Sequence, residues 1–145
     1  MSSLRLATVY ILILFMVGCA TKHTPGTADY RPLDPAHILA PLPEPASTNV
    51  STIIVKRDNG LSGMALSALF TINGIDTAKF PAGTFLKFPI ESGEHIFGVK
   101  SLKKGFPFGT TVFREIPVDC KPDKTYYLRL YVDFEEGIQI QRSSY

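Results

Sequence analysis

Cysteine and tryptophan are the scarcest residues in this sequence. It has no Trp and two cysteines, Cys19 and Cys120, and they form neither a CxxC pair nor a Cys/His spacing typical of a metal site. Cys19 is assigned to a lipid below, which leaves Cys120 without an intrachain partner for a disulfide. We therefore expect no disulfide framework, no metal and no cofactor.

The sequence also lacks a large excess of positive or negative residues. The chain has 15 Lys and Arg against 13 Asp and Glu, so its formal net charge at pH 7 is +2. A nucleic-acid binder needs a strong positive field, so this balance excludes nucleic acid as a partner. No Gly-rich phosphate loop and no stretch of helical periodicity occur, which excludes βαβ folds and their nucleotide sites.

One long apolar run exists, and it lies at the N-terminus over residues 6–17. It is about 12 residues long, the length of a secretory signal core and shorter than the ~20 residues that span a bilayer. Arg5 precedes it and Met16-Val17-Gly18-Cys19 ends it, which resembles the lipobox of bacterial lipoproteins. We predict a signal peptide over residues 1–18 and a palmitate-type lipid on Cys19. A plain signal peptide and an N-terminal anchor helix are the alternatives.

This signal predicts a location in the cell envelope, with the domain held to a membrane by its N-terminal lipid. Ala20, rather than Asp, follows the lipid cysteine. By analogy to enterobacterial sorting, this favours the outer membrane, facing the periplasm, over the inner membrane.

Residues 19–49 are predicted to be a proline-rich linker. Prolines stand at positions 25, 32, 35, 41, 43 and 45, and such a density excludes a helix or a central strand. The segment would be extended and would hold the domain away from the membrane. His23 and His37 lie in it and are interpreted as solvated side chains.

Residues 50–145 show short runs of period-2 alternation separated by turn residues, and no helical pattern. Strands are predicted over residues 50–57, 64–73, 75–80, 83–90, 95–100, 111–118, 125–134 and 138–142. Asn73-Gly74 and Glu135-Glu136-Gly137 are the clearest turn signals between them. Seven or eight such strands predict an all-β, antiparallel β-sandwich. Phe70, Leu128 and Leu130 are predicted core residues.

A family resemblance rests on the turns of this domain: Thr71-Ile72-Asn73-Gly74, Lys79 to Phe85, Ser92-Gly93-Glu94-His95 and Lys124 to Leu128. The pattern resembles bacterial lipoprotein domains of unknown function related to PEGA-type surface modules. The resemblance covers about residues 50–142, with Ser92 where Pro is common. It implies a small transthyretin-like or immunoglobulin-like sandwich and brings no catalytic residues.

Three features of the sequence are candidates for chemistry. Gly60-Leu61-Ser62-Gly63 falls short of the G-x-S-x-G nucleophile elbow and is interpreted as a turn. Glu94 and His95 are neighbours in a strand, so their side chains point to opposite faces, and a structural role is favoured for the histidine. Cys120 continues an apolar period-2 row and is predicted to be buried, the alternative being an exposed thiol that pairs between chains.

Two features are candidate partner contacts. The first is a loop with Lys103, Lys104, Phe106 and Phe108, whose aromatic rings would insert into a partner or a lipid surface, or else plug the end of the sandwich. The second is the row Tyr127, Arg129 and Tyr131, of residue types enriched at interface hot spots. Its alternative is ordinary cross-strand packing on a solvent face.

Taken together, these patterns predict a non-enzymatic binding or assembly role for a lipid-anchored envelope protein, with an envelope protein as partner. A carbohydrate- or peptidoglycan-contacting module is one alternative, and a small hydrolase is the other. The first would need solvent-facing tyrosines in a shallow groove. The second would need His95 within hydrogen-bond reach of a serine or an acid. The oligomeric state is left open.

Overall fold

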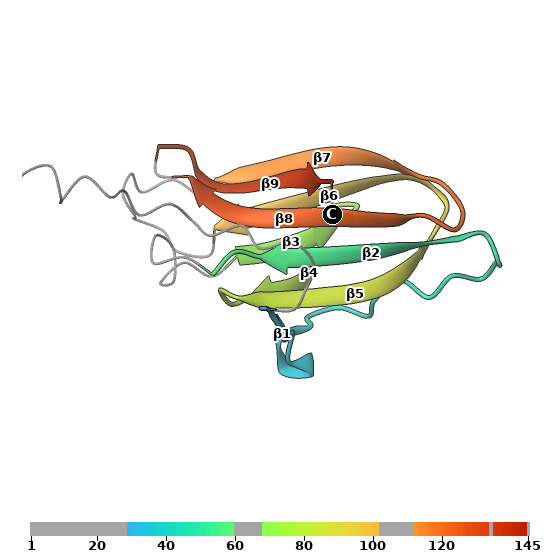
Figure 1. Ribbon diagram of the computed structural model, residues 1–145, viewed down its shortest axis with the longest axis horizontal. Helices are drawn as coiled ribbons and strands as arrows, with labels where there is room; N and C mark the ends of the chain where they lie inside the picture. The colour runs from blue at the N-terminus through green and yellow to red at the C-terminus, as the bar shows by residue number, and fades with distance from the viewer. Residues whose placement is uncertain (1–28, 60–67, 102–111, 134, 145) are drawn as a thin grey trace, which may run out of the picture.

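Two β-sheets face each other in the computed structural model, which describes residues 29–59, 68–101, 112–133 and 135–144. The five-stranded sheet has the order β1-β5-β2-β8-β9 and the four-stranded sheet the order β4-β3-β6-β7 (Figure 1). The strands are β1 Arg31–Pro32, β2 Val50–Arg57, β3 Ala68–Ile72, β4 Ile75–Phe80, β5 Thr84–Glu91, β6 Gly93–Ser101, β7 Phe113–Cys120, β8 Thr125–Asp133 and β9 Gly137–Ser143. The predicted all-β sandwich is confirmed.

The core lies between the sheets and follows from the alternation of the strands. Phe70, Leu128 and Leu130 have no exposed area, as predicted. Phe70 stacks on Phe97 with ring centroids 6.0 Å apart and meets the edge of Phe80 at 5.7 Å. Because period 2 places every second residue of a strand on one face, the apolar rows of β3 and β8 both point into this layer.

Strand direction differs from the prediction in two places. Most pairs are antiparallel, including the β8–β9 hairpin, but β2 runs parallel to β8 and β1 runs parallel to β5. A parallel pair needs a long crossover, and between β2 and β8 the chain builds the whole four-stranded sheet and β5. Alternation shows which residues are buried but not which strands lie side by side.

The predicted linker boundary at Val50 is wrong for residues 29–49. Tyr30 and Leu33 are buried, and Ile38 and Leu42 pack against the core cluster. The amide of Arg31 donates to the carbonyl of Gly83 at 2.9 Å, and the amide of Leu33 donates to Phe85 at 2.8 Å. Proline density had excluded a central strand, and β1 is indeed an edge strand, where Pro32 is tolerated.

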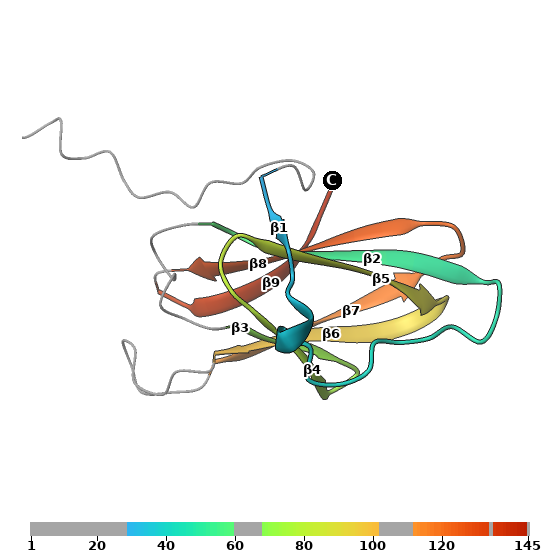
Figure 2. The same ribbon diagram turned by 90° about the horizontal axis from the view of Figure 1, so that it is seen from below.

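We call residues 30–40 the strap, because they cross one open side of the sandwich from β5 to β4 (Figure 2). A single 3-10 turn, η1 Pro35–His37, bends the strap, and its N-cap Asp34 accepts from the amide of Ala36 at 2.9 Å. Ile38 then bridges to Ala78, and the amide of Leu39 donates to the carbonyl of Thr77 at 2.8 Å. The strap therefore covers the edges of both sheets on this side.

Candidate functional site

The row Tyr127, Arg129 and Tyr131 lies on the outer face of the five-stranded sheet, as its alternation with Leu128 and Leu130 predicts. All three side chains are half-buried. The parallel register places Lys56 of β2 beside Arg129. We call the group Tyr30, Lys56, Asp58, Tyr127, Arg129 and Tyr131 the β2–β8 face.

Asp58 holds Arg129 in one position. Nε of Arg129 donates to both carboxylate oxygens of Asp58 at 3.0 Å, and Nη2 donates to Oδ2 at 2.5 Å. The Asp58 side chain is 2% exposed and that of Arg129 is 15% exposed. These hydrogen bonds are the main reason why the pKa of Arg129 is raised above its ordinary value. The guanidinium also lies 4.9 Å from the ring centroid of Tyr131.

Lys56 is the second cation of the face and has no exposed area. Its Nζ lies 5.5 Å from the ring centroid of Tyr30 and 5.8 Å from that of Tyr127. Burial lowers the pKa of Lys56, although Asp58 opposes the shift. A strap residue, Tyr30, thus contributes one ring of an aromatic pair around a buried ammonium group.

The next residue along β2, Arg57, points to the opposite side of the sheet from Lys56. It is 1% exposed, and burial lowers its pKa to about 10. Lys56 and Arg57 at the end of β2 and Asp58 directly after it therefore follow one another, and all three are buried. Such a concentration of buried charge is unusual in a small domain, because removing each group from water costs free energy.

The arrangement suits recognition of a polar group. Nε and Nη2 of Arg129 are occupied by Asp58, whereas Nη1 has no hydrogen-bond partner in the described part of the chain. A guanidinium held in this way presents a fixed donor edge beside an aromatic ring. Its two neighbours on β8, Tyr127 and Tyr131, offer rings and hydroxyl groups at the same surface.

Sequence reasoning found the β8 row but missed Tyr30, Lys56 and Asp58. Asp58 lies 71 residues from Arg129 in the chain, so no local pattern connects the two. Tyr30 had been placed in the linker. The charged end of β2, Lys56-Arg57-Asp58, was the one available signal, because three charged residues in a row at the end of a β-branched strand are atypical of a buried element.

The other predicted site residues lie outside the described residues. They are the lipid attachment residue Cys19 and the loop residues Lys103, Lys104, Phe106 and Phe108. The Gly60-Leu61-Ser62-Gly63 stretch lies outside them too.

His95 connects two turns, and both of its ring nitrogens are engaged. Nε2 lies 2.8 Å from the backbone carbonyl oxygen of Glu91, and Nδ1 lies 3.2 Å from the side-chain nitrogen Nδ2 of Asn73. A carbonyl oxygen only accepts, so Nε2 carries the proton and Nδ1 accepts from the carboxamide Nδ2 of Asn73. The carboxamide oxygen of Asn73 in turn accepts from the amide of Ile96 at 2.9 Å. The ring of His95 is thus bonded to a backbone carbonyl and to a carboxamide, rather than to the serine hydroxyl or the carboxylate that a hydrolase would need.

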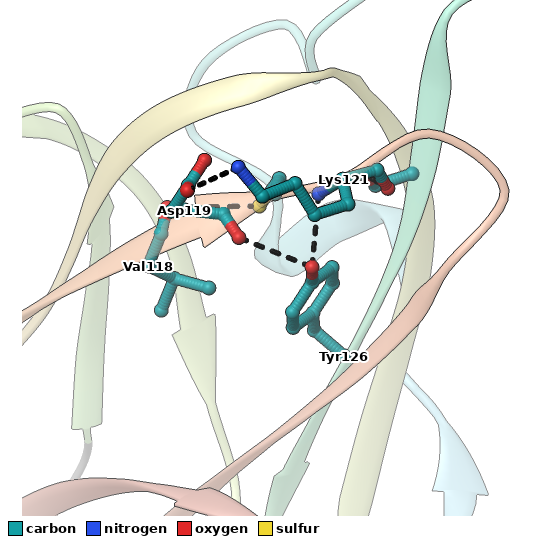
Figure 3. A network of polar contacts seen from close by, with 6 residues as sticks. Val118, Asp119, Lys121 and Tyr126 are labelled. Carbon is teal, nitrogen blue, oxygen red and sulfur yellow. Dashed lines mark hydrogen bonds and ion pairs between the residues drawn. The ribbon is translucent and has the colours of Figure 1, made fainter.

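Cys120 is buried, as predicted, with 1% exposure, and burial is the main reason why its thiol pKa is raised. Its Sγ lies 3.8 Å from the carbonyl oxygen of Val118. Beside it, a small network of Asp119, Lys121 and Tyr126 joins the end of β7 to the start of β8 (Figure 3). The Tyr126 hydroxyl accepts from the amide of Lys121 at 2.9 Å and donates to the carbonyl of Asp119 at 3.1 Å. These bonds fix the turn between β7 and β8, so this network is structural. A thiol with a raised pKa in such a place is a poor nucleophile.

Among the residues that the structure describes, no group of three or more His, Cys, Asp or Glu side chains is placed to hold a metal ion. No helix within the same ranges has the length and apolar character to cross a membrane. Compared with protein-family models, with curated proteins and with solved structures, the chain matches none of them.

Proposed function

We propose that this chain is a lipid-anchored protein of the bacterial cell envelope whose β-sandwich binds a partner without catalysis. The N-terminal signal of residues 1–18, followed by Cys19, supports the anchor. Its membrane is the outer membrane, with the domain in the periplasm. The partner is another component of the envelope, and the β2–β8 face is the surface that contacts it.

The observation that carries the binding role is the fixed guanidinium of Arg129. Asp58 already restricts its rotamers before any partner arrives, so less conformational entropy is lost on binding. Tyr and Arg are also the residue types that most often dominate interface energies. A half-buried row of Tyr127, Arg129 and Tyr131 therefore has both the composition and the preorganisation of a contact surface.

The strap changes how far the domain stands from the membrane. The predicted linker reached residue 49, but the described fold begins at Asp29. Only residues 20–28 then separate the lipid cysteine from the domain, a span of at most about 35 Å when fully extended. The proposed partner therefore lies close to the membrane that carries the lipid.

A photocrosslinking residue at position 131 tests the contact in intact cells. We expect it to give a covalent adduct with an envelope component, whereas the same probe at Lys87 gives none. Lys87 is a matched control, because it is exposed on β5 of the same sheet. In the Tyr131 probe background, Arg129→Lys should reduce the adduct, because lysine lacks the planar fork that Asp58 holds. Equal adducts from both positions, or none from position 131, would contradict the proposal.

The anchor has its own test. Cys19→Ser should release the protein from membranes or leave it as uncleaved precursor, and metabolic labelling with a fatty acid should mark the wild type alone. A Cys19→Ser protein that fractionates, migrates and labels like the wild type would rule out the lipid anchor without bearing on the β2–β8 face.

Contact with an envelope carbohydrate is the second candidate function. The stacked pair of Arg129 and Tyr131 favours it, because a planar donor beside an aromatic ring can meet a sugar hydroxyl and the sugar face together. Sedimentation of the full chain with purified peptidoglycan separates the two candidates. Co-sedimentation of the wild type that is lost in Tyr131→Ala would support carbohydrate as the ligand. If the protein stays unbound at every tested concentration, the protein partner remains as the candidate.

A further inference from the structure

The described sheets have four edges, and three of them are protected against pairing with another strand. β1 is two residues long and contains Pro32. β4 is covered by the strap at Ile38 and Leu39. β7 carries Pro117 in its interior. Short strands, covering segments and prolines are the usual means by which proteins prevent edge-to-edge association.

The orientation of the prolines shows that they serve this purpose. The carbonyl of Val112 accepts from Ser101 of β6, so alternate residues from 112 onward face β6, and Pro117 faces outward. On β5, the carbonyls of Gly83 and Phe85 face β1, so Pro89 faces the same edge farther along the strand. Both prolines therefore remove a donor from an outward-facing position, where no ladder bond is lost.

β9 is the fourth edge and has none of these devices. The carbonyl of Leu130 accepts from Asp58, so Leu130 faces β2, and its partner on β9, Ile140, faces away from β8. By alternation, Ile138 and Arg142 also direct their amide and carbonyl groups outward. None of these groups has a hydrogen-bond partner in the described part of the chain.

We propose that β9 pairs with β9 of a second copy of this chain, antiparallel and centred on Ile140. In this register Ile140 faces its own equivalent, and Ile138 faces Arg142 of the second copy. The outward amide and carbonyl groups of all three residues then form the hydrogen bonds that the single chain leaves unmade. The two five-stranded sheets become one continuous sheet across a twofold axis.

The side chains of β9 favour its own copy as occupant. On the opposite face of the strand, Gln139 lies across from Gln141 of the second copy; Gln139 is 8% exposed and its Nε2 donates to the carbonyl of Glu136 at 3.2 Å. Arg142 is the only charged residue of the strand, and in this register it faces an isoleucine rather than another arginine. Self-pairing therefore brings no like charges opposite one another, which would destabilise the pair. A strand from a different protein needs complementary side chains of its own, whereas the second copy already has them.

Sedimentation equilibrium of the full chain, solubilised in a density-matched detergent, measures the mass. We expect twice the mass of a single chain for the wild type, and the mass of a single chain for Arg142→Pro. That substitution copies the outward-facing prolines of β5 and β7. Arg142→Ala is the matched control: it loses the same side chain, and its contact with the ring of Tyr126, but keeps the amide, so it should remain dimeric.

A disulfide crosslink tests the register. Gln139→Cys with Gln141→Cys should give a covalent dimer on oxidation, because directly opposite residues of this kind have Cα atoms about 4.5 Å apart, within disulfide reach. Gln139→Cys with Ser143→Cys is the register control, because its nearest partners lie about 7–8 Å apart on the diagonal and should not crosslink. Buried Cys120 is common to both variants.

Either experiment can overturn the proposal. A wild-type chain that stays monomeric up to its solubility limit, or Arg142→Pro and Arg142→Ala with equal masses, would contradict pairing through β9. If Arg142→Pro does not fold, Gln139→Lys with Gln141→Lys replaces it, since the register then places lysines opposite one another and should give monomers. Equal crosslinking of the two cysteine pairs would contradict the register centred on Ile140.

Discussion

The outer faces of the two sheets each carry an ion pair, but one pair is buried and the other is exposed to solvent. On the five-stranded sheet, Asp58 and Arg129 form an ion pair whose side chains are 2% and 15% exposed. On the four-stranded sheet, Asp76 and Lys100 form one whose side chains are 47% and 29% exposed. Water screens the second pair and is largely excluded from the first. Burial, rather than the count of ion pairs, therefore decides what each is worth to stability.

The two outer faces differ in burial because different parts of the chain cover them. The strap brings Tyr30 over Lys56, which covers part of the β2–β8 face. On the other face, Gly98 leaves a gap between strands, and the side chains of Thr71 and Phe113 lie over it. One face is covered by a distant piece of chain, and the other only by its own side chains.

Of the variants considered, removal of the buried carboxylate should lower the free energy of unfolding the most. Asp58→Asn leaves Arg129 without its anion, and breaking a buried pair from one side costs about 3–5 kcal/mol of unfolding free energy. Urea denaturation of the full chain measures it. Replacing both partners, as in Asp58→Leu with Arg129→Met, should recover most of the loss. A single variant as stable as the wild type would show that the pair is effectively solvated.

Uncovering the same face should have the next largest effect. Tyr30→Ala removes a 7% exposed aromatic ring that the sequence placed in a linker, and we expect a loss of about 2–4 kcal/mol. Ala28→Gly, just before the described fold, should change little and serves as the control. If the two variants melt together, the strap does not belong to the cooperative unit, and the domain begins at Val50 after all.

The second face should be sensitive to shape rather than charge. In Gly98→Ala the new Cβ would lie 2.4 Å from the Thr71 hydroxyl oxygen and 2.9 Å from the Phe113 ring. Relieving these contacts should cost about 1–3 kcal/mol. Thermal unfolding measures the loss. Adding Thr71→Ala and Phe113→Ala should restore part of it, since these substitutions remove the hydroxyl oxygen and the ring that the new Cβ would meet. A double or triple variant no better than Gly98→Ala would point to backbone strain.

Breaking the exposed pair should have a smaller effect. Lys100→Ala removes the partner of Asp76 and a cation 5.2 Å from the Phe113 ring, and we expect a loss of at most about 1 kcal/mol. Raising the salt concentration should shrink this loss further while leaving that of Asp58→Asn nearly unchanged. A loss as large as that of Asp58→Asn would remove the contrast between the two faces.

The pH dependence of the buried lysine should be the smallest effect, because desolvation and Asp58 act on it in opposite directions. Burial lowers the pKa of Lys56, so in the interval below its ordinary value the unfolded chain binds more protons than the folded one. Stability therefore rises as the pH rises through that interval. Urea midpoints at pH 8.5, 9.5 and 10.5 should rise more in the wild type than in Lys56→Met. Parallel curves would show that the amine titrates as in water.

Much of the fold was predictable because its cause is local. The predicted strands 50–57 and 75–80 match β2 and β4 residue for residue, and the buried row of β8 was assigned correctly. The candidate site was predictable only in its β8 half. Tyr127, Arg129 and Tyr131 share a face by alternation, whereas Asp58 reaches Arg129 through the pairing of two strands that are far apart in the sequence.

Local residue patterns were enough to assign most of the strands, their turns and their buried faces. Each depends on residues within about ten positions, where apolar periodicity and turn chemistry act directly. Three features emerge only in the folded chain: β2 lies parallel to β8, residues 29–49 belong to the fold, and β9 is the edge of the described sheets that no proline or covering segment protects. These outcomes depend on which segments meet across the core. The backbone hydrogen bonds between strands are much alike for every sequence, so a local pattern does not by itself identify the neighbour of a strand.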